Sequence, residues 1–153
     1  MKFEVASYSD IPELCTLLNS LFEQEAEFQP DHEAQIRGLE LIIKNSNTGT
    51  ILIARDNDEV IGMVNLLYTI STALGTRVGI LEDMVMSRSA RGSGIGSKLI
   101  QFALGYAEEH GCKRITLLTD NDNVGAHKFY QKHGFSRSPM VVYRKQLNER
   151  LSQ

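Results

Sequence analysis

The sequence predicts an α/β protein of the α+β type, with a mixed and mostly antiparallel central sheet flanked by helices on both faces. Three runs rich in β-branched residues follow one another in the middle of the chain and are separated by short polar turns, which is typical of antiparallel strands. Runs with apolar residues at three- and four-residue steps precede and follow them, which indicates amphipathic helices. A late helix between two strands would add a parallel pair.

The first half of the chain is expected to contain a strand, two helices and a hairpin. A capping side chain followed by proline marks the start of the first helix, because proline lacks an N–H that would be unsatisfied there anyway. The expected elements are a strand at 2–8, a helix from Ser9 to about Glu25, a helix opening at Pro30-Asp31, and strands at 51–55 and 60–70.

The second half is expected to alternate strands and helices. Gly111 and Gly134 each follow a helical pattern and are expected to end it. The expected elements are a strand at 78–86, a long helix at 94–110, a strand at 114–119, a helix at 123–133 and a final strand at 140–146. We find no repeat, linker or low-complexity segment, so residues 1–153 are expected to form a single domain.

Composition excludes several classes of protein. The chain is 42% hydrophobic and 23% charged, as in ordinary globular proteins, and its apolar runs are too short to cross a bilayer. No apolar secretory segment is seen near Met1, so a cytoplasmic location is expected. The net charge of −3 argues against nucleic-acid binding. Cys15 and Cys112 are expected to be reduced structural thiols, and the scattered histidines predict no metal site.

A glycine-rich segment runs from Ser89 to Lys98, between an expected strand and the long helix. Glycines let backbone N–H groups converge on one point, and the helix start adds its partial positive charge, so the segment favours a phosphate-binding concavity. A plain flexible turn is the alternative. Nucleotide patterns do not fit: a P-loop fails at Ser97-Lys98-Leu99, and the dinucleotide pattern has Ser97 at its third glycine.

A second segment runs from Asn123 to Phe135. Asn123 starts a helix, Ala126 is small enough for close approach, and Tyr130 lies about two turns on, so the three residues share a face. Taken alone, Tyr130 could equally be a core aromatic residue with a satisfied hydroxyl group.

Together the two segments resemble the GNAT acyltransferase superfamily, over about residues 60–135. Arg91, Gly94 and Gly96 match its loop pattern Arg/Gln-x-x-Gly-x-Gly/Ala, and the second segment matches Asn-x-x-Ala-x-x-hydrophobic-Tyr-x-x-x-Gly-Phe. The resemblance implies that the loop holds the pyrophosphate of coenzyme A and that the preceding strand splays and pairs with pantetheine amides. The residues implied to bind acetyl-CoA are Met84, Val85, Met86, Arg91, Gly92, Ser93, Gly94, Ile95, Gly96, Ser97, Asn123, Ala126 and Tyr130.

Two adjacent carboxylates, Glu82 and Asp83, interrupt the apolar strand that precedes the loop. Buried carboxylates are costly, so they serve either a structural ion pair or cap, or a function. Strand alternation places them on opposite faces unless a bulge intervenes. We expect Glu82 to act as the base that deprotonates the substrate ammonium through a water molecule, with Asp83 or water alone left as alternatives.

The resemblance implies an N-acetyltransferase that moves an acetyl group from acetyl-CoA, its co-substrate, directly to a primary amine of a small molecule or peptide. Tyr130 would protonate the leaving thiolate, and the amide of Met84 or Val85 would stabilise the oxyanion. The alternative is a non-catalytic acyl-CoA-binding regulatory module. Four acidic residues lie close together between the first two expected helices: Glu23, Glu25, Glu27 and Asp31. They suggest a cationic acceptor as a hypothesis, and a solvated acidic loop is the alternative. No membrane partner is expected, and an exposed final strand could pair two copies as a homodimer.

Overall fold

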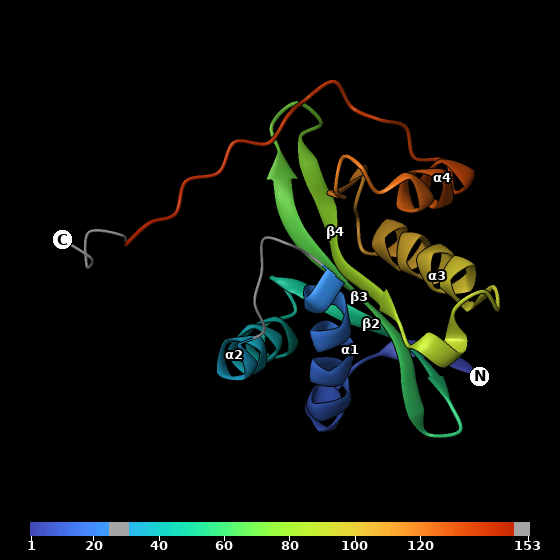
Figure 1. The fold of residues 1–153 in the computed structure, drawn as a ribbon. Helices are drawn as coiled ribbons and strands as arrows, with labels where there is room; N and C mark the ends of the chain where they lie inside the picture. Colours follow the sequence, from blue (N-terminus) through green and yellow to red (C-terminus); the bar gives the residue numbers. More distant parts are fainter. Residues whose placement is uncertain (25–30, 149–153) are drawn as a thin grey trace. The chain divides into compact units, whose positions relative to one another are not determined.

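The computed structural model describes residues 1–24 and 31–148, which fall into two compact units (Figure 1). The first unit runs from Met1 to Asp120 and contains the whole sheet, and the second begins at Asn121. The first unit is built from β1 (Lys2–Val5), α1 (Ile11–Gln24), α2 (His32–Ile43), β2 (Gly49–Asp56), β3 (Glu59–Ser71), β4 (Thr76–Met86), α3 (Ile95–Glu109) and β5 (Ile115–Leu117). Short 3-10 helices at Tyr8–Asp10 and Arg88–Ala90 precede α1 and α3.

The sheet has the order β1-β2-β3-β4-β5. Its first three pairs are antiparallel and the β4–β5 pair is parallel, because α3 forms the crossover between those two strands. The predicted mixed, mostly antiparallel sheet is therefore confirmed. β5 pairs only with residues 79–81 of β4, so the second half of β4 extends beyond it.

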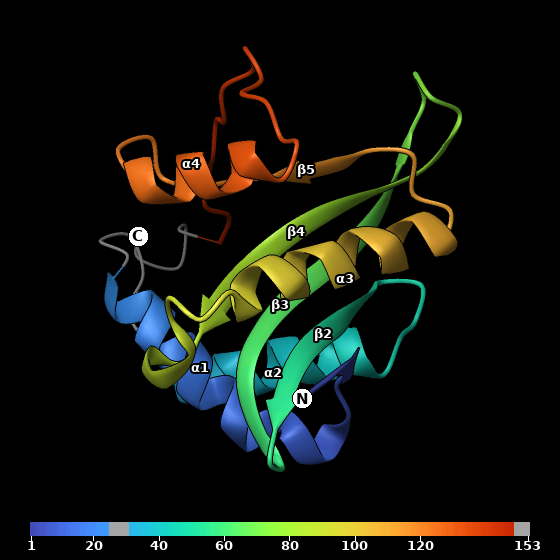
Figure 2. The same cartoon turned by 90° about the vertical axis from the view of Figure 1, so that its right-hand side faces the viewer.

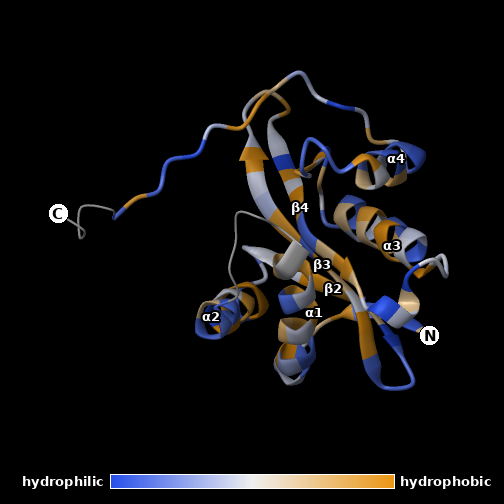
Figure 3. Cartoon of the chain, viewed as in Figure 1, coloured by the Kyte–Doolittle hydropathy of each residue, from blue (hydrophilic) through white to orange (hydrophobic). Residues whose placement is uncertain are grey.

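Helices cover both faces of the sheet, as the sequence predicted: α1 and α2 lie on one face and α3 on the other (Figures 1 and 2). Alternation along β2 sends Ile51 and Ile53 into the core cluster that they share with α1 and α2. Ala54 belongs to a separate cluster. Figure 3 shows the strands largely in hydrophobic colours, whereas the tip of the β2–β3 hairpin is hydrophilic.

A partly buried ion pair network, with Asp10 as its buried member, ties β1, β2 and the start of α1 together. Arg55 donates to Glu4 Oε2 at 3.0 Å and to Asp10 Oδ1 at 2.8 Å, and Asp10 is only 4% exposed. Burial by itself would raise the pKa of Asp10, but the Ser7 N–H and the Arg55 guanidinium outweigh it, and the pKa is lowered. The carboxylate is therefore held ionised inside the fold.

The second unit contains α4 (Val124–Lys132), which begins and ends within one residue of the predicted helix at 123–133, with Gly134 at a φ of 91° shortly after it. The predicted final strand is wrong: residues 140–146 form no strand in the described part of the chain. A strand exists only through hydrogen bonds to a neighbour, and Met140, Val141 and Tyr143 are exposed instead. The expected route to a homodimer therefore lacks the strand on which it rested.

Replacing Arg55 by Met is expected to destabilise the fold by roughly 3 kcal/mol, because it leaves the buried Asp10 carboxylate uncompensated. The matched control is Arg37→Met, at an exposed arginine of α2. Because the folded pKa of Asp10 is lowered, the stabilisation is present at neutral pH and is lost as the pH falls below the ordinary value of 3.8. Urea unfolding at pH 7 should show the difference, and equal midpoints for the two variants would contradict it.

Candidate functional site

The glycine-rich loop ends at the start of α3 in an unusual backbone conformation. Gly92 and Gly94 have φ values of 75° and 84°, which L-amino acids with side chains rarely adopt. Gly94 precedes the first residue of α3, and a Cβ there would meet no atom within 4 Å, so the backbone angle rather than space requires glycine. The first N–H groups of a helix lack intrahelical acceptors and carry partial positive charge, which fits a phosphate.

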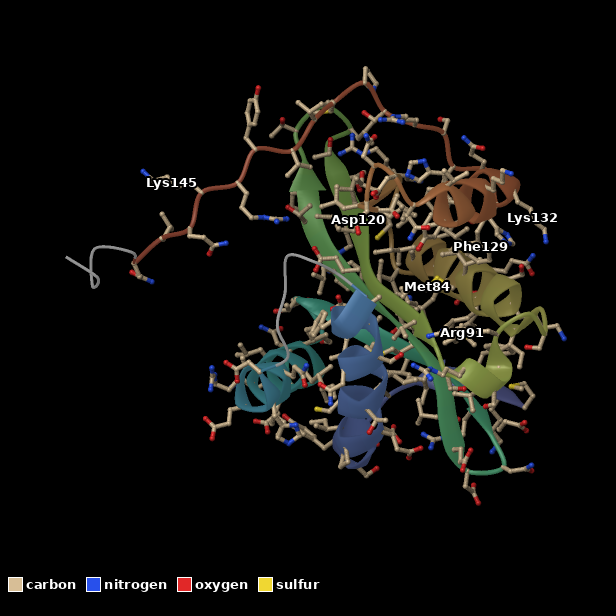
Figure 4. The ribbon with its side chains drawn as sticks, in the orientation of Figure 1. Met84, Arg91, Asp120, Phe129, Lys132 and Lys145 are labelled. Carbon is tan, nitrogen blue, oxygen red and sulfur yellow. The ribbon has the colours of Figure 1, made fainter. Side chains whose placement is uncertain are left out.

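Side chains of the loop hold its shape. Ser93 Oγ donates to the carbonyl of Ala90. The Arg91 guanidinium donates to the Met86 carbonyl and to Ser20 Oγ, both at 3.4 Å, which is long for such bonds (Figure 4). Because Arg91 is exposed and weakly held, it remains available to an anion. Loop residues 92–94 are also exposed, whereas 95–97 are half-buried.

A β-bulge interrupts β4 just after Glu82. The register passes from Asn65 opposite Glu82 to Met63 opposite Val85, so Asp83 and Met84 together face one residue of β3. Asp83 has a φ of 54°, in the left-handed region that Asp tolerates better than most residues. The alternation of side chains between the two faces of the sheet is therefore shifted by one residue at this point. The bulge that Glu82 and Asp83 would need in order to face the same side of the sheet is therefore present.

The bulge places both carboxylates on one cavity of about 300 Å³, on the side of the sheet that carries α1 and α2. The lining residues are Leu18, Phe22, Asp31, Ala34, Gln35, Gly38, Leu39, Ile42, Asn65, Leu67, Glu82 and Asp83. Sequence reasoning missed Gln35 and Asn65. A polar residue in the middle of the apolar strand 60–70 was a signal for Asn65, whereas a glutamine in an amphipathic helix gives no such signal.

Asp83 is the most perturbed acid of the cavity. Burial and then the neighbouring Glu82 charge raise its pKa to about 6, against the opposing effect of a hydrogen bond from Asn65. That bond runs from Asn65 Nδ2 to Asp83 Oδ2 at 2.8 Å. Glu82 itself is exposed. The cavity therefore holds one exposed carboxylate beside one whose proton exchanges close to neutral pH.

The remaining predicted cofactor residues of β4 differ in burial. The side chain of Val85 is buried in the core cluster with α1, so only its backbone can meet a ligand. Met84, labelled in Figure 4, and Met86 are both half-buried by their exposed fractions. Residues 82–86 lie beyond the last residue of β4 that pairs with β5.

Asn123, Ala126 and Tyr130 all lie in the second unit. Asn123 Oδ1 accepts the Ala126 N–H at 3.1 Å and so caps α4. Tyr130 packs edge-on against Phe129 and Phe135, with ring centroids 5.3 and 5.9 Å apart. Burial raises the pKa of Tyr130, so the phenol keeps its proton at neutral pH.

The acidic group that suggested a cationic acceptor lies mostly outside the described residues, which include neither Glu25 nor Glu27 and not the side chain of Glu23. Asp31 is described: it lines the cavity and accepts the Ala34 N–H at 3.1 Å at the start of α2.

Cys15 and Cys112 are buried free thiols, and burial raises the pKa of both. Within residues 1–24 and 31–148, no group of three or more His, Cys, Asp or Glu side chains is placed to hold a metal ion. Helices in that same part of the chain are all too short or too polar to cross a membrane.

Replacing Asp83 by Asn is expected to stabilise the protein at pH 8 by about 3 kcal/mol. The folded pKa of about 6 lies above the ordinary 3.8, so ionisation of Asp83 costs stability as the pH rises between these values. The amide oxygen of the variant side chain would still accept the hydrogen bond from Asn65. Urea unfolding of both proteins at pH 8 and pH 4 checks this, since the difference should vanish at pH 4; a less stable variant at pH 8 would refute it.

The chain matches the acetyltransferase (GNAT) family over residues 11–135. It is 32% identical over 126 residues to the uncharacterized N-acetyltransferase YhfO of Bacillus subtilis (strain 168), covering 80% of this chain and 84% of the relative. It is 26% identical over 133 residues to the aminoalkylphosphonate N-acetyltransferase of Salmonella typhimurium, covering 87% of this chain and 83% of that relative. A transcriptional regulator from Bacillus halodurans C-125 superposes with a TM-score of 0.83 at 26% identity, covering 95% of this chain and 99% of that one.

The family match covers most of the chain and includes both the glycine-rich loop and the Tyr130 segment. The relatives are matched over most of their own length as well. The chain therefore belongs to the GNAT acetyltransferase family and is an acyl-CoA-dependent N-acetyltransferase.

Proposed function

We propose that the protein transfers an acetyl group from acetyl-CoA to a primary amine of a small molecule, by direct attack of the amine on the thioester. The observation that carries the proposal is the bulged second half of β4, which runs from a cavity lined by two carboxylates toward the exposed glycine-rich loop at the start of α3. The amine forms the new N–C bond, the C–S bond breaks, and one proton moves from the ammonium to a base while another reaches the sulfur.

The residues present fit the coenzyme. Backbone amides of residues 92–97 and the Arg91 side chain would bind the pyrophosphate, because this loop is open and its glycines hold positive φ angles. The backbone of residues 84–86, beyond the end of β5, would bind the pantetheine arm by strand addition. Asn123 and Ala126 complete the proposed set. The coenzyme supplies the acetyl group as an activated thioester.

Glu82 is proposed as the base. Its exposed carboxylate on the cavity wall would accept the ammonium proton through a water molecule, because only a neutral amine can attack. Asp83 lines the same cavity, and its pKa of about 6 brings it close to the operating pH, so it is the competing candidate.

Two further groups would act on the reacting thioester. The amide N–H of Met84 or Val85 would stabilise the charge that develops on the carbonyl oxygen. Met84 has no register partner in β3, which leaves its backbone outside that ladder. Tyr130, whose raised pKa keeps it protonated, would donate its proton to the departing thiolate.

A non-catalytic acyl-CoA-binding regulatory module is the second candidate role, favoured by the structural neighbour named as a transcriptional regulator. The two roles differ in turnover and not in coenzyme binding. Thermal unfolding with and without acetyl-CoA, followed by thiol release with a panel of amines, distinguishes them. A melting shift without thiol release from any amine would favour the module, and no shift with any acyl-CoA would overturn both.

Replacing Tyr130 by Phe is expected to lower kcat about 100-fold, because the leaving thiolate loses its proton donor. The acetyl-CoA dissociation constant should stay within about twofold, since only one hydroxyl group is removed. Thiol release gives the rate and calorimetry gives the affinity. The control is Tyr143→Phe, at a tyrosine that is 96% exposed. Equal rates for the two variants would remove Tyr130 from the mechanism.

Replacing Glu82 by Gln is expected to lower kcat about 100-fold, and replacing Asp83 by Asn to lower it less. The Glu82 charge helps to raise the pKa of Asp83. If kcat/KM falls with a midpoint near pH 6 because Asp83 becomes protonated, that midpoint should therefore move to lower pH in Glu82→Gln. The pH dependence of kcat/KM with one amine, measured for both variants, tests this. A larger loss in Asp83→Asn would make Asp83 the base.

A further inference from the structure

Two buried amide side chains on the wall of the cavity each have a carbonyl oxygen that no described residue meets with a hydrogen bond. Asn65 of β3 is 4% exposed and Gln35 of α2 is 8% exposed, and both line the cavity. Asn65 Oδ1 and Gln35 Oε1 accept no hydrogen bond from any residue of 1–24 or 31–148. Buried acceptors are nearly always satisfied in folded proteins, so two on one cavity require an explanation.

The orientation of Asn65 follows from its hydrogen bond to a carboxylate. Asn65 Nδ2 donates to Asp83 Oδ2 at 2.8 Å, and an ionised carboxylate can only accept. Gln35 Nε2 donates to Asn19 Oδ1 at 3.0 Å. In the structure each nitrogen is engaged, and the atom that each residue leaves without a partner among residues 1–24 and 31–148 is its oxygen.

The charges on the same wall have one sign. Asp31, Glu82 and Asp83 line the cavity, and its described lining includes no Lys, Arg or His. The rest of the wall is mainly apolar, from residues such as Leu18, Phe22 and Leu67. The volume of about 300 Å³ is at the small end for ligand clefts, which span about 300–1,000 Å³. The complementary ligand is small, cationic and aliphatic, and its polar ends donate hydrogen bonds.

We propose that this cavity binds the acetyl acceptor as a short aliphatic diamine, with Asn65 Oδ1 accepting from the amine that reacts and Gln35 Oε1 accepting from the second, charged amine. The inference rests on the proposed acetyl transfer and names its substrate class. Asn65 is bonded to Asp83 and stands opposite Glu82 in the sheet, so the reacting amine lies beside the proposed base. Gln35 lies on a different element, α2, and lines the same cavity.

The same wall excludes amines that carry an acidic group. A carboxylate or phosphonate at the far end would face three carboxylates and two carbonyl oxygens, with no cation in the described lining to balance it. Gln35 and Asn65 are therefore specificity-determining residues, and the expected substrate differs from the one in the name of the Salmonella relative.

The first test compares three probes with the same four-carbon body: 1,4-diaminobutane, butylamine and 4-aminobutanoate. Because the second ammonium gains a charge-assisted hydrogen bond, kcat/KM for the diamine should exceed that for butylamine about tenfold or more. The acidic probe should show no measurable turnover. Calorimetric titration of each probe into the protein saturated with coenzyme A gives the same ranking without requiring turnover.

The second test uses Gln35→Met, which removes the free oxygen at nearly constant shape. It should raise KM for 1,4-diaminobutane about tenfold more than KM for butylamine, because the proposed contact of Gln35 is with the second amine, which butylamine lacks. Gln35→Glu keeps an acceptor oxygen and should retain the affinity for the diamine. The control is Gln101→Met, the same change at an exposed position of α3.

Two results would overturn the inference: butylamine or 4-aminobutanoate binding as tightly as the diamine, or Gln35→Met weakening butylamine and the diamine equally. A failure of the proposed acetyl transfer itself would give a different experimental result. In that case no amine releases thiol from acetyl-CoA, and the calorimetric ranking of the three probes still decides what the cavity binds.

Discussion

The β-bulge at Asp83 and Met84 is the constraint on which the site depends. One extra residue in β4 shifts the alternation of side chains, so that Glu82 and Asp83 line the same cavity while Val85 enters the core. The strand then continues past the end of β5 to the loop at the start of α3. Without the extra residue, regular alternation would place the two carboxylates on opposite faces of the sheet.

Several unfavourable features of the first unit lie on the cavity beside this bulge. Asp83 combines a positive φ with a raised pKa, and Asn65 and Gln35 each have a buried oxygen with no hydrogen-bond partner in the described part of the chain. Such strain persists in folded proteins mainly where a ligand or a reaction uses it. The contrast is the Arg55 network, where the buried Asp10 accepts from Arg55 and from the Ser7 amide and serves the fold alone.

Local patterns predicted the order of elements in the first unit because each depends on neighbours in sequence. Apolar spacing gave α1 and α3, and the turn at Asn57-Asp58, where both residues have positive φ, gave the β2–β3 hairpin. The same reasoning failed at 140–146. Alternating apolar residues there suit a strand, but a strand also needs a hydrogen-bonded neighbour, which no local pattern can supply.

The sequence by itself determined the family, the glycines that hold the loop before α3, and the pair of carboxylates in β4, because each is a short pattern with a local physical meaning. Only the tertiary structure decided that both carboxylates line one cavity and that Asn65 donates to Asp83, while its oxygen has no partner among the described residues. It also brought Gln35 of α2 to the same wall. These facts depend on strand register and helix packing between residues far apart in the chain, which are fixed only when the core assembles.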